Sequence, residues 1–225
     1  MDWNAFLAFT RGPLFYASLL IFIAGMVYRL VQVAMLGWDK DQSVARGSKA
    51  GGVVKSFLKG ILILPFIPWI KGAFQKRPIM YIAGGLFHLG LFTVIFLGTP
   101  HMLVWKSLLG FGWPTLALPF VDWLAVAAII GMLVLIVYRR TDAVLRLLSG
   151  PAEYLNWLFV FLPMISGYIM THHLFFRYEV AYSLHMLSVD WMLIWIPFSR
   201  ISHFMFYFFS RTIRGVEWGK RAVTP

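Results

Sequence analysis

Five long runs of apolar residues constrain this fold more than any other feature of the sequence. The runs cover approximately residues 13–36, 79–99, 114–138, 152–171 and 180–209. Each has about the length that an α-helix, rising about 1.5 Å per residue, needs to cross roughly 30 Å of hydrocarbon. Backbone groups in lipid must be hydrogen-bonded within their own segment, and the runs do not alternate apolar with polar residues. We therefore predict an all-α integral membrane protein, a bundle of five transmembrane helices.

The composition agrees with a membrane protein. Of the 225 residues, 60% are hydrophobic and 13% are charged, which is more apolar surface than a soluble core of this size would bury. The first apolar run begins after Arg11 and lacks a small-residue cleavage pattern, so we expect a true span and not a removable signal peptide. No repeat or linker divides the chain, and we expect one membrane domain over residues 1–225.

Cysteine is absent, and this limits the metal chemistry that the chain can support. Its absence excludes disulfides, zinc–thiolate sites, covalent c-type haem attachment and an iron–sulfur cluster held by this chain's own thiolates. The net charge of +11 would suggest nucleic acid in a soluble protein. No basic and aromatic recognition module accompanies it, so we expect no nucleic-acid partner.

The basic residues gather on one side of the predicted bundle. Fifteen Lys and Arg lie in the segments 37–78, 139–150 and 210–225, whereas three lie in 1–12, 100–113 and 172–179. Because Lys and Arg accumulate in cytoplasmic loops, we predict a multi-pass protein of the inner (cytoplasmic) membrane with its N-terminus outside and its C-terminus in the cytoplasm. The segment at approximately 55–75 is apolar but short, and two prolines interrupt it, so we expect it to lie at the membrane interface.

Histidines inside the predicted spans are the most informative polar residues. Ionisable groups in a membrane are costly, so they usually face the bundle interior and carry a function. His88 lies in the second span and His101 at its outer end. His185 and His203 lie in the fifth span, 18 residues apart, which is five helical turns. In a continuous helix both would project from one face, about 27 Å apart along the axis.

Because these two spans run antiparallel, each histidine of the second span lies at about the same depth in the membrane as one histidine of the fifth. This arrangement pairs His88 with His203 near the inner face, and His101 with His185 near the outer face. Two His–metal–His sites stacked across a bilayer suit two b-type haems, bound by neutral imidazoles without covalent attachment. A membrane histidine also serves as an interhelical hydrogen-bonding residue, and that alternative stays open for each of the four. His172 and His173 follow the fourth span, and we expect them in a solvated outer loop.

Several short motifs resemble one family, the gamma (cytochrome b) subunit of respiratory nitrate reductase. Its relatives include membrane subunits of sulfite-reduction-associated and heterodisulfide-reductase-like complexes. The matching stretches are Phe-His-Leu-Gly at 87–90, Thr-Pro-His at 99–101, Tyr-Arg-Arg at 138–140, Leu-His at 184–185 and Pro-Phe-Ser-Arg-Ile-Ser-His at 197–203. The resemblance covers about residues 10–210 and includes the five spans and their orientation.

The resemblance implies a haem b subunit that exchanges electrons with quinone. In the family, histidines of the second and fifth spans bind two haems, quinol is oxidised near the outer haem, and electrons leave through the inner one to an iron–sulfur partner. His88, His185 and His203 match ligand positions. The family's second histidine of the second span lies ten residues after the first, where this chain has Gly98. Either His101 takes its place, or the outer haem is absent or differently bound.

Three further residues suggest roles around these predicted cofactors. Arg200 precedes His203 by one turn and is placed to pair with a haem propionate, although snorkelling to the cytoplasm explains it comparably. Lys106 in the outer loop is a candidate hydrogen-bond donor to a quinone carbonyl, or an interfacial anchor. Asp190 is an acid in an apolar helix that either accepts protons from quinol or lies in the headgroup zone.

The sequence thus predicts an electron-transfer subunit of an oxidoreductase complex that does not itself act on the terminal substrate. It would pass electrons between membrane quinone and a cytoplasmic iron–sulfur or catalytic subunit docked on its basic segments, with lipid around its spans. One or two haems fit the histidines. The alternatives are a haem-free transporter that uses the histidines for protons or metal, and a passive membrane anchor of a soluble enzyme.

Overall fold

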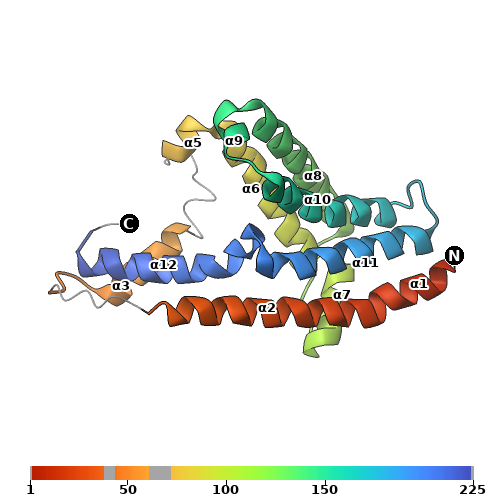
Figure 1. Cartoon of the computed structure of the whole chain (residues 1–225), viewed down its shortest axis with the longest axis horizontal. Coiled ribbons are helices and arrows are strands. Elements are labelled where there is room, and N and C mark those ends of the chain that lie inside the picture. Colours follow the sequence, from red (N-terminus) through yellow and green to blue (C-terminus); the bar gives the residue numbers. More distant parts are fainter. Residues whose placement is uncertain (1, 38–43, 61–71, 224–225) are drawn as a thin grey trace. The chain divides into compact units, whose positions relative to one another are not determined.

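The computed structural model describes residues 2–37, 44–60 and 72–223, and every regular element in these ranges is helical (Figure 1). The helices are α1 (Trp3–Phe9), α2 (Phe15–Met35), α3 (Lys49–Leu58), α5 (Gly72–Lys76), α6 (Pro78–Phe92), α7 (Thr99–Leu109), α8 (Leu118–Thr141), α9 (Ala143–Leu147), α10 (Pro151–Thr171), α11 (Tyr178–Trp195) and α12 (His203–Lys220). Short π-helical turns are η1 (Thr10–Leu14) and η4 (Thr93–Leu97), and short 3-10 turns are η5 (Ile196–Phe198) and η6 (Arg200–Ser202).

The all-α prediction is confirmed, and the helices are compatible with a multi-pass membrane protein. In the described residues, four helices are long and apolar enough to cross a membrane, or five if the interrupted segment from α11 to α12 counts as one span. Large apolar side chains lie exposed on these helices, among them Leu20 and Trp123 at 68% and 75% exposure. Such surfaces are expected where lipid replaces water as the solvent.

The first span begins earlier than the hydropathy pattern predicted. Its helix starts at Trp3, where the Asp2 carboxylate caps the backbone N–H groups of Asn4 and Ala5. Arg11 therefore lies within the helical segment, with its guanidinium 4.9 Å from the centre of the Tyr182 ring. This cation–π contact accommodates a charge that the sequence analysis treated as the boundary of the span.

The second span ends at Gly98, whose backbone is extended (φ −79°, ψ 130°). A new helix, α7, starts at Thr99, and Pro100 lies in its first turn, where a missing N–H costs nothing. His101 therefore belongs to a separate helix and not to a continuation of the second span. Of the predicted interfacial segment 55–75, residues 61–71 lie outside the described residues, while its two ends lie in α3 and α5.

The predicted fifth span, 180–209, is not a continuous helix. Pro197 has no backbone N–H with which to continue the helical ladder, and Ser199 is extended (φ −128°, ψ 173°). The Ser199 hydroxyl then accepts from the N–H of Ile201 and starts a new turn. The prediction that His185 and His203 project from one face of a single helix is therefore wrong, because the helical register is lost between them.

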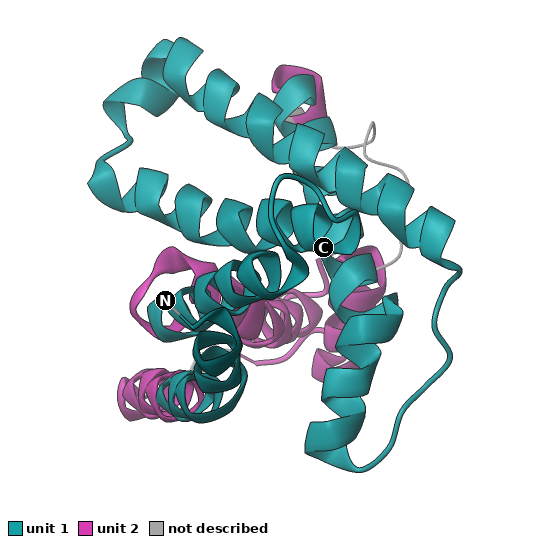
Figure 2. Cartoon of the chain, turned by 90° about the vertical axis from the view of Figure 1, so that its right-hand side faces the viewer, with its two compact units in different colours: residues 1–21, 78–195 teal, residues 22–77, 196–225 magenta. Residues whose placement is uncertain are grey.

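The chain forms two compact units (Figure 2). Unit 1 comprises residues 1–21 and 78–195, with α1, the start of α2, and the helices from α6 to α11. Unit 2 comprises residues 22–77 and 196–225, with the rest of α2, α3, α5 and α12.

Small residues bring α6 and α8 together in unit 1. A Cβ atom at Gly131 would lie 2.6 Å from the Ala83 carbonyl oxygen, and one at Gly90 would lie 2.7 Å from the Ala128 Cβ. Close approach through small residues is typical of helices in membranes, where dispersion and not hydrophobic exclusion drives association. Indole N–H groups join the remaining helices: Trp157 donates to the Met132 carbonyl, and Trp195 donates to the Asn156 side chain.

Glycines also join α3 to α12 in unit 2. A Cβ at Gly215 would lie 2.5 Å from the Val53 Cα, and one at Gly219 would lie 2.9 Å from the Gly52 Cα. A Cβ at Gly52 would overlap the Gly215 carbonyl oxygen. The two backbones are therefore in direct contact, and no larger residue fits at these positions.

Candidate functional site

Two of the predicted site histidines face each other in unit 1. The ring centres of His101, on α7, and His185, on α11, are 6.3 Å apart, and their planes make an angle of 85°. Two imidazoles that bind one metal ion from opposite sides, each nitrogen at about 2 Å, have ring centres about 6 Å apart. In that arrangement both ring planes contain the axis through the metal, so a large angle between the planes is allowed. The spacing therefore fits one metal ion between the rings.

A hydrogen bond from another helix fixes the tautomer of His185. The His185 Nδ1 lies 3.2 Å from the hydroxyl oxygen of Ser166 on α10, and Ser166 gives its own proton to the Leu162 carbonyl at 2.6 Å. The imidazole must then be the donor, so Nδ1 carries the proton and the neutral ring presents Nε2 as its lone-pair nitrogen. A metal-binding histidine has this arrangement, with one nitrogen held by a partner and the other directed at the metal.

Gly167 makes room for the His185 ring. A Cβ atom built at Gly167 would lie 3.0 Å from the His185 Cε1 and 3.3 Å from its Nδ1. His185 is only 7% exposed, so the ring has little freedom to move aside. Ser166 and Gly167 together set both the position and the protonation of this imidazole.

The fold holds His101 in place by turning α7 back on the end of the second span. The break at Gly98 leaves backbone carbonyls without helical partners, and two indoles satisfy them. Trp105 donates to the Ile95 carbonyl at 3.0 Å, and Trp113 donates to the Phe96 carbonyl at 2.5 Å. Burial also lowers the pKa of His101, which keeps its imidazole in the neutral form that binds metal.

His88 and His203 share a different arrangement. The His88 Nδ1 lies 2.7 Å from the Gly84 carbonyl oxygen, and the His203 Nδ1 lies 2.9 Å from the Arg200 carbonyl oxygen. Because a carbonyl only accepts, Nδ1 is the donor in both neutral rings and Nε2 is again the lone-pair nitrogen. Both side chains are exposed, His88 in unit 1 and His203 in unit 2. Their predicted role as ligands of one inner haem stays a prediction.

The predicted roles of Arg200 and Lys106 also stay predictions. Arg200 lies in the turn η6, and its backbone carbonyl orients His203. Lys106 lies on α7, with an exposed side chain, five residues after His101. Each is near a predicted ligand in the chain, which is the basis of the two hypotheses.

Asp190 is a buried acid in unit 1. It is 1% exposed, and its Oδ1 accepts a hydrogen bond of 3.0 Å from the hydroxyl of Ser18 on α2. Its Oδ2 is buried and makes no hydrogen bond with the described residues. Both sequence hypotheses for Asp190, a proton acceptor for quinol or an acid near the outer headgroup zone, stay predictions. An apolar surrounding favours the neutral form of a carboxyl, so a carboxylate at this position gains stability by taking up a proton.

His172 and His173 directly follow α10 and lie exposed in the loop that leads to α11, as predicted from the sequence. The His172 Nε2 is 3.7 Å from a carboxylate oxygen of Asp122, and its ring contacts that of Tyr168, with centres 4.3 Å apart and planes at 44°. These contacts join α10 to α8 and give His172 a structural role.

The ligand count decides which metal centre the His101–His185 pair fits. Among the described residues, no three or more His, Cys, Asp or Glu side chains are grouped to hold an ion. Protein sites for bare zinc or calcium use three or more ligands. Two opposed imidazoles fit a metal whose other ligands come with it, as the four nitrogens of a porphyrin do. In ligand number, the pair is therefore compatible with a porphyrin-bound metal and not with a bare zinc or calcium ion.

Sequence reasoning found the histidines but missed the residues that position them. Ser166 and Gly167 are adjacent small residues in an apolar helix, and no spacing rule singles them out. The indoles of Trp105 and Trp113 were interpreted as interfacial residues, although both donate to carbonyls at the helix break. Their contacts depend on the turn at Gly98, which hydropathy does not reveal.

Comparison with known proteins finds a full-length relative without a described role. Over 215 residues the chain is 27% identical to a protein of Nitratidesulfovibrio vulgaris, and the match covers 94% of this chain and 92% of the relative. That relative is named simply "Protein", which says nothing about its activity. No family model matches the chain, and no solved structure matches it.

Proposed function

We propose that this chain is the haem b subunit of a membrane redox complex. The single observation that carries the proposal is the opposition of His101 and His185, with ring centres 6.3 Å apart. Interhelical hydrogen bonding, the alternative for a membrane histidine, already accounts for His185 Nδ1, which bonds Ser166 at 3.2 Å. It does not account for the approach of His101, because a direct bond between the two imidazoles would bring their centres closer than 6.3 Å.

The residues of the chain would bind and orient the cofactor. His101 and His185 would hold the haem iron, Ser166 would hold the His185 tautomer, and Gly167 would leave space for its ring. The bound haem supplies reversible one-electron chemistry, with a potential tuned by its axial ligands and their hydrogen bonds. The apolar surroundings keep water away from the site.

The wider proposal follows the sequence prediction. His88 and His203 would bind a second haem, membrane quinone would be the electron-exchange partner at the outer side, and a cytoplasmic iron–sulfur subunit would be the partner at the inner side. Quinol releases two electrons and two protons, so a proton acceptor is needed as well as an electron acceptor. Asp190, buried and with one oxygen outside any described hydrogen bond, suits that acceptor role.

The test is a pyridine haemochrome assay with reduced-minus-oxidised spectra on the purified protein. We expect a b-type spectrum in the wild type, and loss of one haem in both His101→Ala and His185→Ala. His172→Ala is the matched control, because His172 contacts Asp122 and Tyr168 and should leave the spectrum unchanged. A wild-type protein without a b-type spectrum would overturn the proposal and leave the haem-free transporter or the passive anchor.

A further inference from the structure

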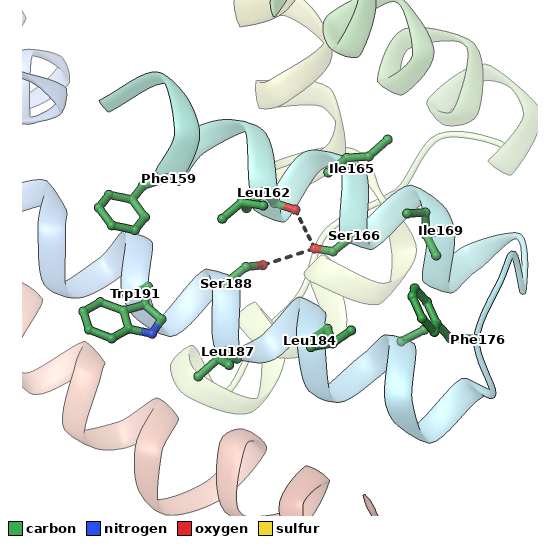
Figure 3. A pocket seen from close by; sticks show the side chains of 11 residues that line it. Phe159, Leu162, Ile165, Ser166, Ile169, Phe176, Leu184, Leu187, Ser188 and Trp191 are labelled. Atoms are coloured by element: carbon green, nitrogen blue, oxygen red, sulfur yellow. Dashed lines mark hydrogen bonds between the residues drawn. The ribbon is translucent and has the colours of Figure 1, made fainter. Parts of the chain in front are cut away.

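An open apolar groove lies between α10 and α11 in unit 1 (Figure 3). Its volume is about 510 Å³. Aromatic and aliphatic side chains form most of its lining, including Phe159, Leu162, Phe176 and Trp191. Small-molecule sites are typically clefts of about 300–1,000 Å³, mostly apolar, with a few polar groups that fix the ligand's orientation. The size and lining of the groove fit such a site.

The polar side chains of the groove are two serines that reach each other across it. The hydroxyl oxygens of Ser166, on α10, and Ser188, on α11, are 3.1 Å apart and meet inside the groove in Figure 3. Ser166 also accepts from His185 Nδ1 at 3.2 Å. The Ser188 hydroxyl lies 2.7 Å from the His185 carbonyl oxygen, to which it donates. A row of polar atoms therefore leads from the groove, past Ser188 and Ser166, to the imidazole of a proposed haem ligand.

We propose that this groove binds the head group of the membrane quinone and that Ser188 hydrogen-bonds its oxygen, with Ser166 lying between Ser188 and His185. This inference rests on the proposed function, because quinol bound in the groove would pass its electrons to the haem proposed at His185. It differs from the sequence hypothesis, which assigned quinone to Lys106 and Asp190.

The chemistry of a serine hydroxyl suits this ligand in both of its redox states. A quinone carbonyl only accepts a hydrogen bond, whereas the hydroxyl of the reduced quinol both donates and accepts. By rotation, the Ser188 hydroxyl turns its proton from the His185 carbonyl to a quinone oxygen, or keeps it there and accepts from a quinol hydroxyl, without moving the backbone. A lysine ammonium only donates and would favour the oxidised form.

The rest of the groove suits the apolar part of the molecule. Phe159 and Trp191 lie nearly parallel at one end, with ring centres 6.2 Å apart and planes 6° apart, and they offer a flat surface for a quinone ring. Trp191 is 54% exposed, and the groove is open, so a long isoprenoid tail leaves it directly into lipid. A phospholipid acyl chain would fill the same volume but would use neither serine.

Photoaffinity labelling with a short-chain azidoquinone tests the inference on the purified protein. We expect cross-links on the stretches 159–176 and 181–191, and protection by excess decylubiquinone. Ser188→Ala should raise the half-saturating probe concentration about five-fold, the effect of losing one neutral hydrogen bond. Ser188→Thr keeps the hydroxyl and should restore wild-type labelling. Leu162→Trp should fill the groove and abolish labelling.

Controls separate this inference from the proposed function. Ile130→Trp places the same bulk on α8, at an exposed residue outside the groove, and should not change labelling. Haem spectra of every variant are recorded in parallel, and we expect Ser188→Ala and Leu162→Trp to retain both haems. Labelling that persists in Leu162→Trp, or that maps to other helices, overturns the quinone groove while leaving the haem proposal intact. A wild type without haem overturns the proposed function whatever the labelling shows.

Discussion

The surroundings of His185 differ from those of His88 and His203 in the source of the hydrogen bond that orients the ring. His185 is buried, and its Nδ1 donates to Ser166 on another helix. The rings of His88 and His203 are exposed, and each Nδ1 donates to a carbonyl of its own turn. The three rings therefore reach the same tautomer by different means. Tertiary packing defines the position of His185, whereas the local turn defines the tautomer of the other two.

This difference indicates which ligand ring the fold already holds in position before a cofactor binds. A ring held between Ser166 and Gly167 is preorganised, so little ordering remains for the cofactor to impose. The rings of His88 and His203 are more exposed than that of His185, so we expect their final positions to depend more on the cofactor.

Removal of the His185 ring tests directly whether the pocket around it is preorganised. His185→Gly is expected to lose the bis-imidazole signature of one haem, with up to about half of the total haem released. Added imidazole should restore the signature, because Ser166 and Gly167 still define a site for the free ring. In His203→Gly the ring position is exposed, and imidazole should restore less. If imidazole restored the signature equally in both variants, the His185 site would not be more preorganised than the His203 site.

The glycine contact between α3 and α12 should matter for stability but not for the His101–His185 pair. In Gly215→Ala the new Cβ would lie 2.5 Å from the Val53 Cα, and backbone cannot yield as a side chain does. We expect a destabilisation of about 3 kcal/mol and faster proteolysis at Lys49 and Lys55 on α3. The haem signature assigned to unit 1 should persist. Its loss would show that the two units do not behave independently.

Added bulk beside His185 should disturb haem binding without removing any ligand. Gly167→Val would crowd the imidazole and is expected to cost about 1–3 kcal/mol, seen as faster haem loss during gel filtration. Gly85→Ala is the matched control, because a Cβ there has no described atom within 4 Å, and its effect should stay within about 0.5 kcal/mol. Identical haem retention in the two variants would contradict the role assigned to Gly167.

The hydrogen bond from His185 to Ser166 should tune the reduction potential. An imidazole that donates from Nδ1 is a stronger electron donor and favours ferric iron. Ser166→Ala is therefore expected to raise the midpoint potential of one haem by something on the order of tens of millivolts, measured by spectroelectrochemical titration. Ser107→Ala, an exposed serine bonded to the Val104 carbonyl of its own helix, should leave both potentials unchanged.

Hydropathy predicted most of the fold because the spans are long and nearly uncharged. The predicted spans 114–138 and 152–171 correspond to α8 and α10 within a few residues. The errors lie where tertiary contacts override the local pattern. The first helix extends back to Trp3 because Tyr182 accommodates Arg11, and the last predicted span breaks because Pro197 and the extended Ser199 end its ladder.

The candidate site was predictable only in part. Depth arguments paired His101 with His185, and the structure places these rings together. Those arguments assumed continuous helices, whereas the chain uses a turn at Gly98 and two indole hydrogen bonds to bring His101 into place. Contacts from elements far apart in the sequence, such as Ser166 with His185 or Ser18 with Asp190, have no local signature.

The angle between the two imidazole planes offers the most direct measurement of the central claim. Low-temperature electron paramagnetic resonance of the oxidised protein reports how two axial imidazoles are oriented around low-spin ferric iron. With the planes of His101 and His185 at 85°, we expect a strongly anisotropic signal with a large maximum g value, lost in both His101→Ala and His185→Ala. A protein without a low-spin ferric signal, or a signal that survives both substitutions, would contradict the binding of iron by this pair.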